Sequence, residues 1–270
     1  RRIYVDSRFK AAGSASNTDF SFDLPVNINL PKRAKCFVDG FSCPVSWYTV
    51  EQNQNDRLYI RELAGSTTTD RVIILDPKNY SGPSLETELQ VKLNQNSTVG
   101  TYSVSYSLQT GRITINISSS ANTFRILCDD ELPTAGWAGG SIVDPNSANG
   151  ILRHSGTSLA HNMVGGGSNG PYISDLIDLL HVHTLYLMCD KVNPTSLGPR
   201  GNGQVLARIP VSASYGFVMH HENHSEHSWS DMSGQSFQRL HFKLTDAYGN
   251  IVNLHGGNVS FALILDVPES

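Results

Sequence analysis

Histidine is the residue type in this sequence whose spacing could support chemistry. His181 and His183 are two residues apart, so on a strand their side chains would share one face. Imidazole and carboxylate groups together bind zinc and non-haem iron, so a metal site is the first chemistry to consider. A second group of such residues lies further along the chain and comprises His220, His221, His224, His227, Glu222, Glu226 and Asp231.

A comparison with metal-dependent jelly-roll enzymes of the cupin kind argues against such a site. Their motif also begins with H-x-H on a strand, but a glutamate follows a few residues later. Here the segment after the pair runs from Thr184 to Asp190 and lacks that glutamate. A glycine-flanked strand with one further histidine is not evident either. We therefore expect solvated loop histidines and a hydrogen-bonded pair, with a cupin-like enzyme kept as an alternative.

The other catalytic motifs are absent or incomplete. The sequence contains no G-x-S-x-G, no P-loop and no C-x-x-C. The run Gly165–Ser168 could bind phosphate only if a helix followed, and Asn169-Gly-Pro171 argues against one. Asp129, Asp130 and Glu131 lie in a turn, where capping and solvation are the default. The sequence thus predicts no catalytic, metal-binding or cofactor-binding residue and no cofactor, and we expect no enzyme.

The four cysteines are expected to be free thiols. Cys36, Cys43, Cys128 and Cys189 lie far apart and mostly within apolar runs, where cysteine acts as a small hydrophobic residue. Seven residues of extended strand span roughly 23 Å, so a bridge between Cys36 and Cys43 would require a hairpin. These features favour a reducing compartment.

Composition excludes some partners. The chain has 270 residues and a net charge of −4, which gives no general reason to expect nucleic-acid binding. The short basic cluster Pro31–Lys35 is expected to be a solvated turn that enters a strand. No apolar run approaches the ~20 residues of a membrane span. We therefore predict no specific nucleic-acid partner and no membrane span.

The elements that would position these groups are mostly strands with one apolar face. In the segment 237–266, two alternating runs are separated by turn residues at 246–250 and 255–258. The last run is apolar on nearly both faces, which predicts a central strand with earlier parts of the chain paired around it. The residues expected in the core are Phe242, Leu244, Phe261 and Leu263.

The rest of the chain is predicted to be largely β. One helix is expected after Ser81-Gly-Pro83, with Leu85, Leu89 and Leu93 on one face. Further strands are predicted at 2–6, 20–30, 34–45, 58–63, 71–75, 124–128, 176–192 and 204–211, and a hairpin at 101–117. Long polar connections are expected at 131–170, 193–203 and 215–236.

Several short segments carry a family resemblance. They are Asp19–Pro25, Asp144–Asn149, Leu185–Asp190, Gln204–Pro210 and Leu244–Asn250. In this order they resemble the minor capsid (penton) proteins of Polinton-like viruses and virophages. The resemblance implies an all-β fold: a single antiparallel jelly-roll β-sandwich of about eight core strands, with a small helix-plus-hairpin insertion. Residues 1–57 and 128–270 would form the capsid domain, and residues 58–127 the insertion.

The same resemblance implies a function. Five copies would form a homo-pentamer that closes an icosahedral vertex beside a double-jelly-roll major capsid protein. The protein would then belong to the virion, after assembly inside the host cell. The alternative from another class is a carbohydrate-binding jelly roll, which would use Trp47, Trp137 or Trp229 together with loop acids. A pentamer would favour the capsid, and a glycan-binding monomer the lectin.

Overall fold

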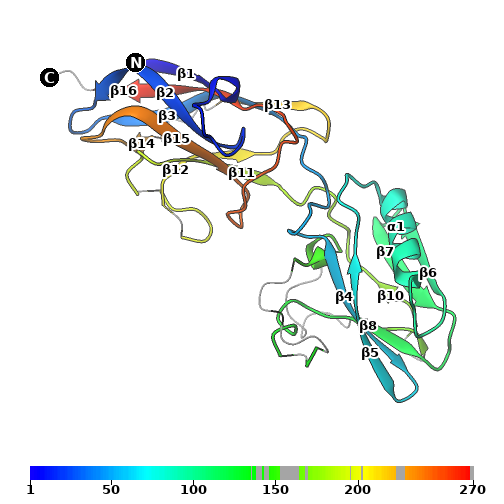
Figure 1. Cartoon of the computed structure of the whole chain (residues 1–270). Coiled ribbons are helices and arrows are strands. Elements are labelled where there is room, and N and C mark those ends of the chain that lie inside the picture. Colours follow the sequence, from blue (N-terminus) through cyan, green and yellow to red (C-terminus); the bar gives the residue numbers. More distant parts are fainter. Residues whose placement is uncertain are drawn as a thin grey trace. The chain divides into compact units, whose positions relative to one another are not determined.

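The structure is a computed structural model of the chain and divides into two compact units. The jelly-roll unit comprises Arg1–Trp47 and Val182–Ser270, and the insertion unit comprises Tyr48–His181 (Figure 1). The residues that the structure describes are 1–134, 136–137, 142, 146–152, 164–167, 170–194, 196–201, 203–222 and 229–267.

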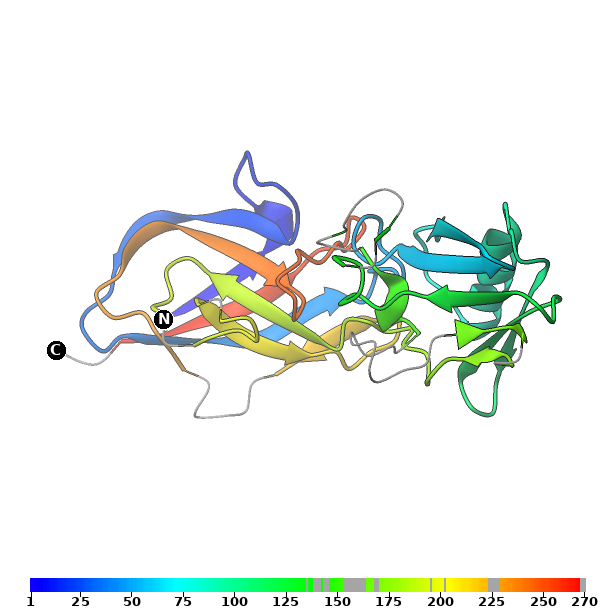
Figure 2. The same cartoon turned by 90° about the horizontal axis from the view of Figure 1, so that it is seen from below.

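The jelly-roll unit consists of two antiparallel sheets. One sheet has the order β1 (Arg2–Asp6), β16 (Ser260–Asp266), β3 (Lys35–Pro44) and β13 (Val218–His221), and the short β14 (Ser230–Asp231) also pairs with β3. The other sheet has the order β12 (Val205–Pro210), β11 (Thr184–Cys189), β15 (Ser236–Thr245) and β2 (Asp19–Asn29). A short 3-10 helix, η1 (Ser7–Phe9), follows β1. Figure 2 shows β15 in orange beside β2 in blue.

The path of the chain through these sheets is that of a jelly roll. β1, β2 and β3 alternate between the two sheets, β11 and β12 are neighbours in the second sheet, and β13, β15 and β16 alternate again. Two Greek keys wrapped in this way define the jelly roll. The predicted fold class, a single antiparallel jelly-roll sandwich with about eight core strands, is therefore confirmed.

The two closing strands, β15 and β16, confirm the buried positions predicted from the alternating pattern but differ in how the strands pair. β16 lies between β1 and β3, so its central position is confirmed, and Phe242, Leu244, Phe261 and Leu263 are all buried. The two strands do not form a hairpin, however, because β15 and β16 belong to different sheets. The turn after β15 is closed by a bridge between Thr245 and Ile251 and by the Asp246 carboxylate, which accepts from the amides of Tyr248 and Asn250. The chain from 252 to 259 then crosses the sandwich.

Two other predicted boundaries were wrong. The expected strand 176–192 is a strand only over Thr184–Cys189. The expected loop 215–236 contains β13 and β14, which are short strands along β3. Strands of two to four residues carry too little alternation to be recognised without their partners. β2 runs through Pro25 as one strand, and its register against β15 shifts between Asp23 and Ile28.

The insertion unit contains two small sheets and one helix. One sheet has the order β5 (Thr67–Ile74), β4 (Arg57–Ala64), β8 (Thr123–Ile126) and β9 (Val164–Gly165). The other has the order β10 (Tyr172–Ile173), β7 (Arg112–Ile117) and β6 (Tyr102–Ser107). The helix α1 (Gly82–Asn94) begins with a capping box between Ser81 and Ser84, and a short 3-10 helix, η2 (Ala148–Gly150), comes after β8.

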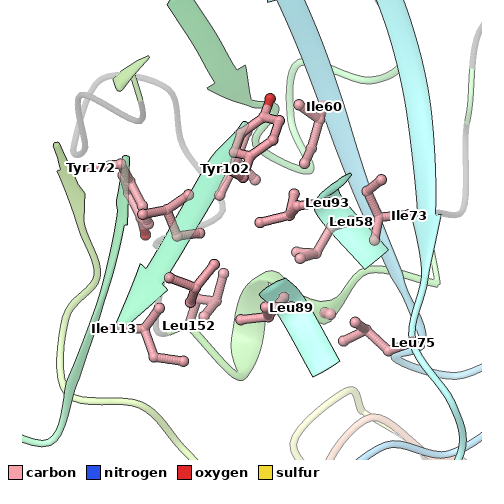
Figure 3. Close-up of a cluster of buried hydrophobic side chains, with 14 of the residues drawn as sticks. Leu58, Ile60, Ile73, Leu75, Leu89, Leu93, Tyr102, Ile113, Leu152 and Tyr172 are labelled. Carbon is pink, nitrogen blue, oxygen red and sulfur yellow. The ribbon is translucent and has the colours of Figure 1, made fainter. Parts of the chain in front are cut away.

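The helix fills the space between the two sheets. Leu85, Leu89 and Leu93 are buried, as their spacing predicted. Figure 3 shows Leu89 and Leu93 pointing into a cluster formed with Leu58 of β4 and Tyr102 of β6. Ile151, Leu152, Tyr172 and Ile177 belong to the same core.

This shared core explains why the unit is larger than the expected insertion. The sequence placed the insertion at 58–127, whereas the compact unit runs from Tyr48 to His181. β10 pairs with β7, and β9 pairs with β8, so chain beyond residue 128 completes both sheets. The described residues between 128 and 181, expected in the capsid domain, therefore belong to the same compact unit as the insertion.

A buried carboxylate lies inside this unit. Glu62 of β4 is fully buried and accepts hydrogen bonds from the Tyr102 hydroxyl (2.8 Å) and from the Thr98 amide (2.9 Å) and hydroxyl (2.6 Å). It also pairs with Arg71, whose guanidinium donates to the Leu93 carbonyl at 3.0 Å. Burial, together with the hydrogen bond to Glu62, raises the pKa of Tyr102. Four segments of the unit are tied together by these contacts.

The polar face of α1 also closes one sheet edge. Gln90 accepts from the Val104 amide and donates to the Tyr102 carbonyl, each at 2.6 Å. Asn94 makes the corresponding pair of bonds with Tyr102, both at 2.9 Å, and Glu86 accepts from the Tyr106 amide at 2.8 Å. The edge of β6 is therefore paired with helix side chains, which blocks the addition of another strand.

Candidate functional surfaces

The structure does not assemble the described histidines into a metal site. His181 and His183 both precede β11, so they do not share a strand face. His220 and His221 are adjacent on β13 and therefore point to opposite faces of its sheet. Among the residues that the structure describes, no group of three or more His, Cys, Asp or Glu side chains could hold a metal ion. His224, Glu226 and His227 lie outside the described residues.

Asp231, the other acid of that group, has a structural role. Its carboxylate accepts hydrogen bonds from the Ser233 amide (2.8 Å) and hydroxyl (2.5 Å), and from the Asn193 side chain (3.0 Å). The bonds from Ser233, more than the others, hold the pKa of Asp231 below its usual range. These contacts fix β14 against the connection after β11.

One Ser-His-Asp constellation is present that the sequence did not reveal. On the outer face of the second sheet, the Ser21 hydroxyl lies 3.1 Å from His241 Nδ1, and Asp19 Oδ1 lies 2.9 Å from His241 Nε2. Asp19 and Ser21 are two apart on β2, and His241 is opposite them on β15. Only the strand register, which joins positions 220 residues apart, brings them together.

The surroundings of these three residues favour a structural role, in which they hold two strands together, over catalysis. Acyl-transfer sites need free donors aimed at the developing oxyanion. The Ser21 amide is already donated to Ser14 Oγ at 3.1 Å, and the Ser21 carbonyl accepts from the Ala11 amide at 2.8 Å. The open hollow nearby is lined by Asp23, Gln238 and Arg239, and Asp23 is already paired with Arg239. The trio therefore holds the edge strand β2 to β15.

The tryptophans are not arranged as a sugar-binding platform. Trp47 is buried. Trp137 packs edge to face against Tyr59 with ring centroids 5.5 Å apart, and Trp229 packs in the same way against Phe37 at 4.6 Å. Each ring is thus engaged within its own unit.

The glycine run and the acidic turn also have structural roles. A Cβ at Gly166 would lie 2.5 Å from the Ile117 side chain, and the φ of Gly166 is +87°, so the run permits close packing against β7. Glu131 accepts from the Cys128 amide at 2.9 Å and pairs with Arg125. Asp129 accepts from the Asn149 side chain at 2.9 Å.

The basic cluster and the cysteines behave as expected. Residues 31–34 form a tight turn that leads into β3, with the Ala34 amide donating to the Pro31 carbonyl. All four cysteines are free and buried. No helix in the described part of the chain is long and apolar enough to cross a membrane.

Comparison with solved structures identifies the fold over the whole chain. The crystal structure of the SeMet-labelled mavirus penton protein matches 98% of this chain and 99% of its own, with a TM-score of 0.52 and 10% sequence identity. This chain has the fold of a penton protein. The coverage includes both the jelly-roll unit and the insertion unit. No protein-family model matches the sequence, and no curated protein matches it.

The penton fold agrees with the family resemblance of the short sequence segments. At 10% identity the two chains share an architecture without sharing most side chains. The jelly-roll order of the strands is therefore the common feature, and the residues that make contacts in this chain have to be found from its own surface.

Proposed function

We propose that this protein is a structural subunit of a viral capsid, a penton that forms homo-pentamers at icosahedral vertices. The penton fold over the full length of the chain is the observation that supports this role. Its neighbour in the shell would be a double-jelly-roll major capsid protein. The protein would be located in the virion, after assembly inside the host cell, and would need no cofactor, catalytic residue or specific nucleic acid.

The connections of the jelly-roll unit offer the contacts that a ring requires. Identical copies close into a ring through heterologous contacts, in which one surface binds a different surface of the next copy. Leu197, between β11 and β12, is 68% exposed, and Phe217, before β13, is also 68% exposed. Large exposed apolar side chains among polar neighbours are typical of interface centres. Both lie in connections predicted from the sequence.

The third predicted connection, 131–170, belongs to the insertion unit. Leu132 and Trp137 in this segment pack over Tyr59, on the face of β4 opposite the helix. That part of the connection therefore covers its own unit. We assign the ring contacts to the two connections of the jelly-roll unit.

Native mass spectrometry of the purified protein, alone and after co-expression with the major capsid protein of the same genome, tests this proposal. We expect rings of five copies, single or joined in pairs, and Phe217→Asp should reduce their abundance. Leu108→Asp is the matched control, because Leu108 is 83% exposed on the turn between β6 and β7. A monomer that stays out of shells under both conditions would contradict the proposal.

A further inference from the structure

The edge of β1 presents unpaired backbone groups. Arg1 and Leu265 exchange both backbone hydrogen bonds, each at 2.7 Å, and the Ser7 amide donates to the Val259 carbonyl at 2.9 Å. Antiparallel pairing alternates, so the odd residues of β1 face β16 and the even ones face away. The backbone groups of Arg2, Tyr4 and Asp6 therefore point outward. Among the described residues, none forms a backbone hydrogen bond with the outward groups of Arg2 and Tyr4, whereas Asp6 is the N-cap of η1 and its carbonyl accepts the first bond of that helix.

Two other edges of the chain are closed by its own residues. The edge of β6 is paired with side chains of α1. At the start of β2, the Asp19 amide donates to Ser16 Oγ at 2.9 Å, and the Asp19 carbonyl accepts from the Ser16 amide at 3.0 Å. Natural sheets block their edges in this way because an open edge invites another strand. At the edge of β1 no described residue forms such a block, and Tyr4 on it is 71% exposed.

The side chains of β1 are complementary to a second copy of β1. If two such strands pair antiparallel with Tyr4 opposite Tyr4, each Arg2 lies opposite an Asp6. Opposite charges and aromatic pairs directly across an antiparallel ladder both stabilise it. This register also pairs all three outward-facing residues. A shift of two residues leaves one of them without a partner and separates the charges.

Asp6 has to exchange partners to form this contact. Its carboxylate already pairs with Arg8, with the closest atoms 2.6 Å apart, and that guanidinium holds the pKa of Asp6 below its usual range. Arg8 remains 66% exposed, so the group stays at the surface. The Asp6 carboxylate accepts one hydrogen bond from the Arg8 amide and three from the Arg8 guanidinium, which fills its about four acceptor positions. A second guanidinium therefore has to replace that of Arg8. Arg2 donates a long bond, 3.4 Å, to the Tyr4 hydroxyl, and its guanidinium lies 6.0 Å from the centre of the Tyr4 ring.

We propose that two copies of this protein pair through their β1 strands, antiparallel and centred on Tyr4. The contact is isologous, so it closes after two copies and adds no third. It is thus separate from any contact that closes a ring, and it does not rest on the proposed function.

Charge exchange combined with sedimentation velocity tests this pairing on the full chain. We expect the parent protein to have twice the mass of Arg2→Asp and of Asp6→Arg, whatever the number of subunits in those variants. Each variant alone places like charges opposite each other, which should weaken pairing about tenfold or more. An equimolar mixture of the two variants restores both ion pairs, so the doubled mass should return.

A second pair of variants tests the backbone. Tyr4→Pro removes an outward N–H, a change that an edge strand tolerates, and should abolish doubling. Tyr4→Val keeps the N–H and should retain doubling. Far-UV circular dichroism and the unfolding midpoint verify that each variant is folded. The proposal is overturned if the parent never doubles up to about millimolar concentration, the weak limit of specific binding. It is also overturned if doubling survives both Arg2→Asp and Tyr4→Pro.

Discussion

Phe242 of β15 and Phe261 of β16 meet edge to face, with ring centroids 5.1 Å apart, although their strands belong to different sheets. Phe242 also lies against Phe20 of β2 at 5.6 Å, and Phe261 against Phe41 of β3 at 6.4 Å. The four rings connect two strands of each sheet through the middle of the sandwich. This row of rings joins the two layers of the jelly roll.

Truncation of Phe261 should therefore destabilise the jelly-roll unit strongly. We expect Phe261→Ala to lower the free energy of unfolding by roughly 3–5 kcal/mol, the usual cost of removing a buried aromatic ring. Urea denaturation measures the change. Phe9→Ala is the control, because Phe9 is 74% exposed and its removal should leave the midpoint almost unchanged. A Phe261→Ala midpoint equal to that of the parent would refute the core assignment.

The parts of the fold that were predictable are those with long, regular patterns. The eleven-residue strand β2, the alternation around Phe242 and Phe261, and the leucine stripe of α1 all predicted their elements, because burial imposes the period directly. The penton resemblance then implied a jelly roll, which alternation alone cannot specify.

The rest depended on contacts between distant residues. β13 and β14 exist because β3 offers partners, and β9 and β10 because β7 and β8 do. The contact between Ser21 and His241 depends on strand register. The position of Arg2 and Asp6 at a sheet edge could not be predicted either, because an unpaired edge is recognised only when the strand pairings are known.

The buried carboxylate of Glu62 should be essential for the insertion unit. Glu62→Gln leaves the Arg71 guanidinium without its charged partner, and breaking a buried pair in this way costs about 3–5 kcal/mol. Thermal unfolding followed by near-UV circular dichroism measures the loss. Asp23→Asn is the matched control, because its ion pair with Arg239 is exposed and contributes little. Similar midpoints for both variants would contradict this role.

The cysteines should be unreactive in the folded protein. Burial raises the pKa of Cys43 and of Cys189 to about 12, and that of Cys128 to about 11; burial also raises the pKa of Cys36. The thiolate is the reactive form, so raising the pH from 7 to about 9, past the usual thiol pKa, should not start labelling. Ellman's reagent should label no thiol in the native protein and all four after denaturation. Rapid labelling of the native protein would contradict the burial.

The histidine group should not hold a metal. His220 and His221 point to opposite faces of β13, and Asp231 is occupied by Ser233 and Asn193. Elemental analysis of dialysed protein should therefore find much less than one equivalent of zinc, iron or manganese per chain. A stoichiometric metal that is lost on His220→Ala would instead support an enzyme.

The position of this chain in assembled particles tests the central claim most directly. Co-expression with the major capsid protein, followed by cryo-electron microscopy of purified shells, locates each subunit by its shape. The account predicts density for the jelly-roll unit and the insertion unit of this chain at the five-fold axes. The account would be contradicted if another protein closed every vertex of the shells and this chain were found only as a soluble glycan-binding monomer.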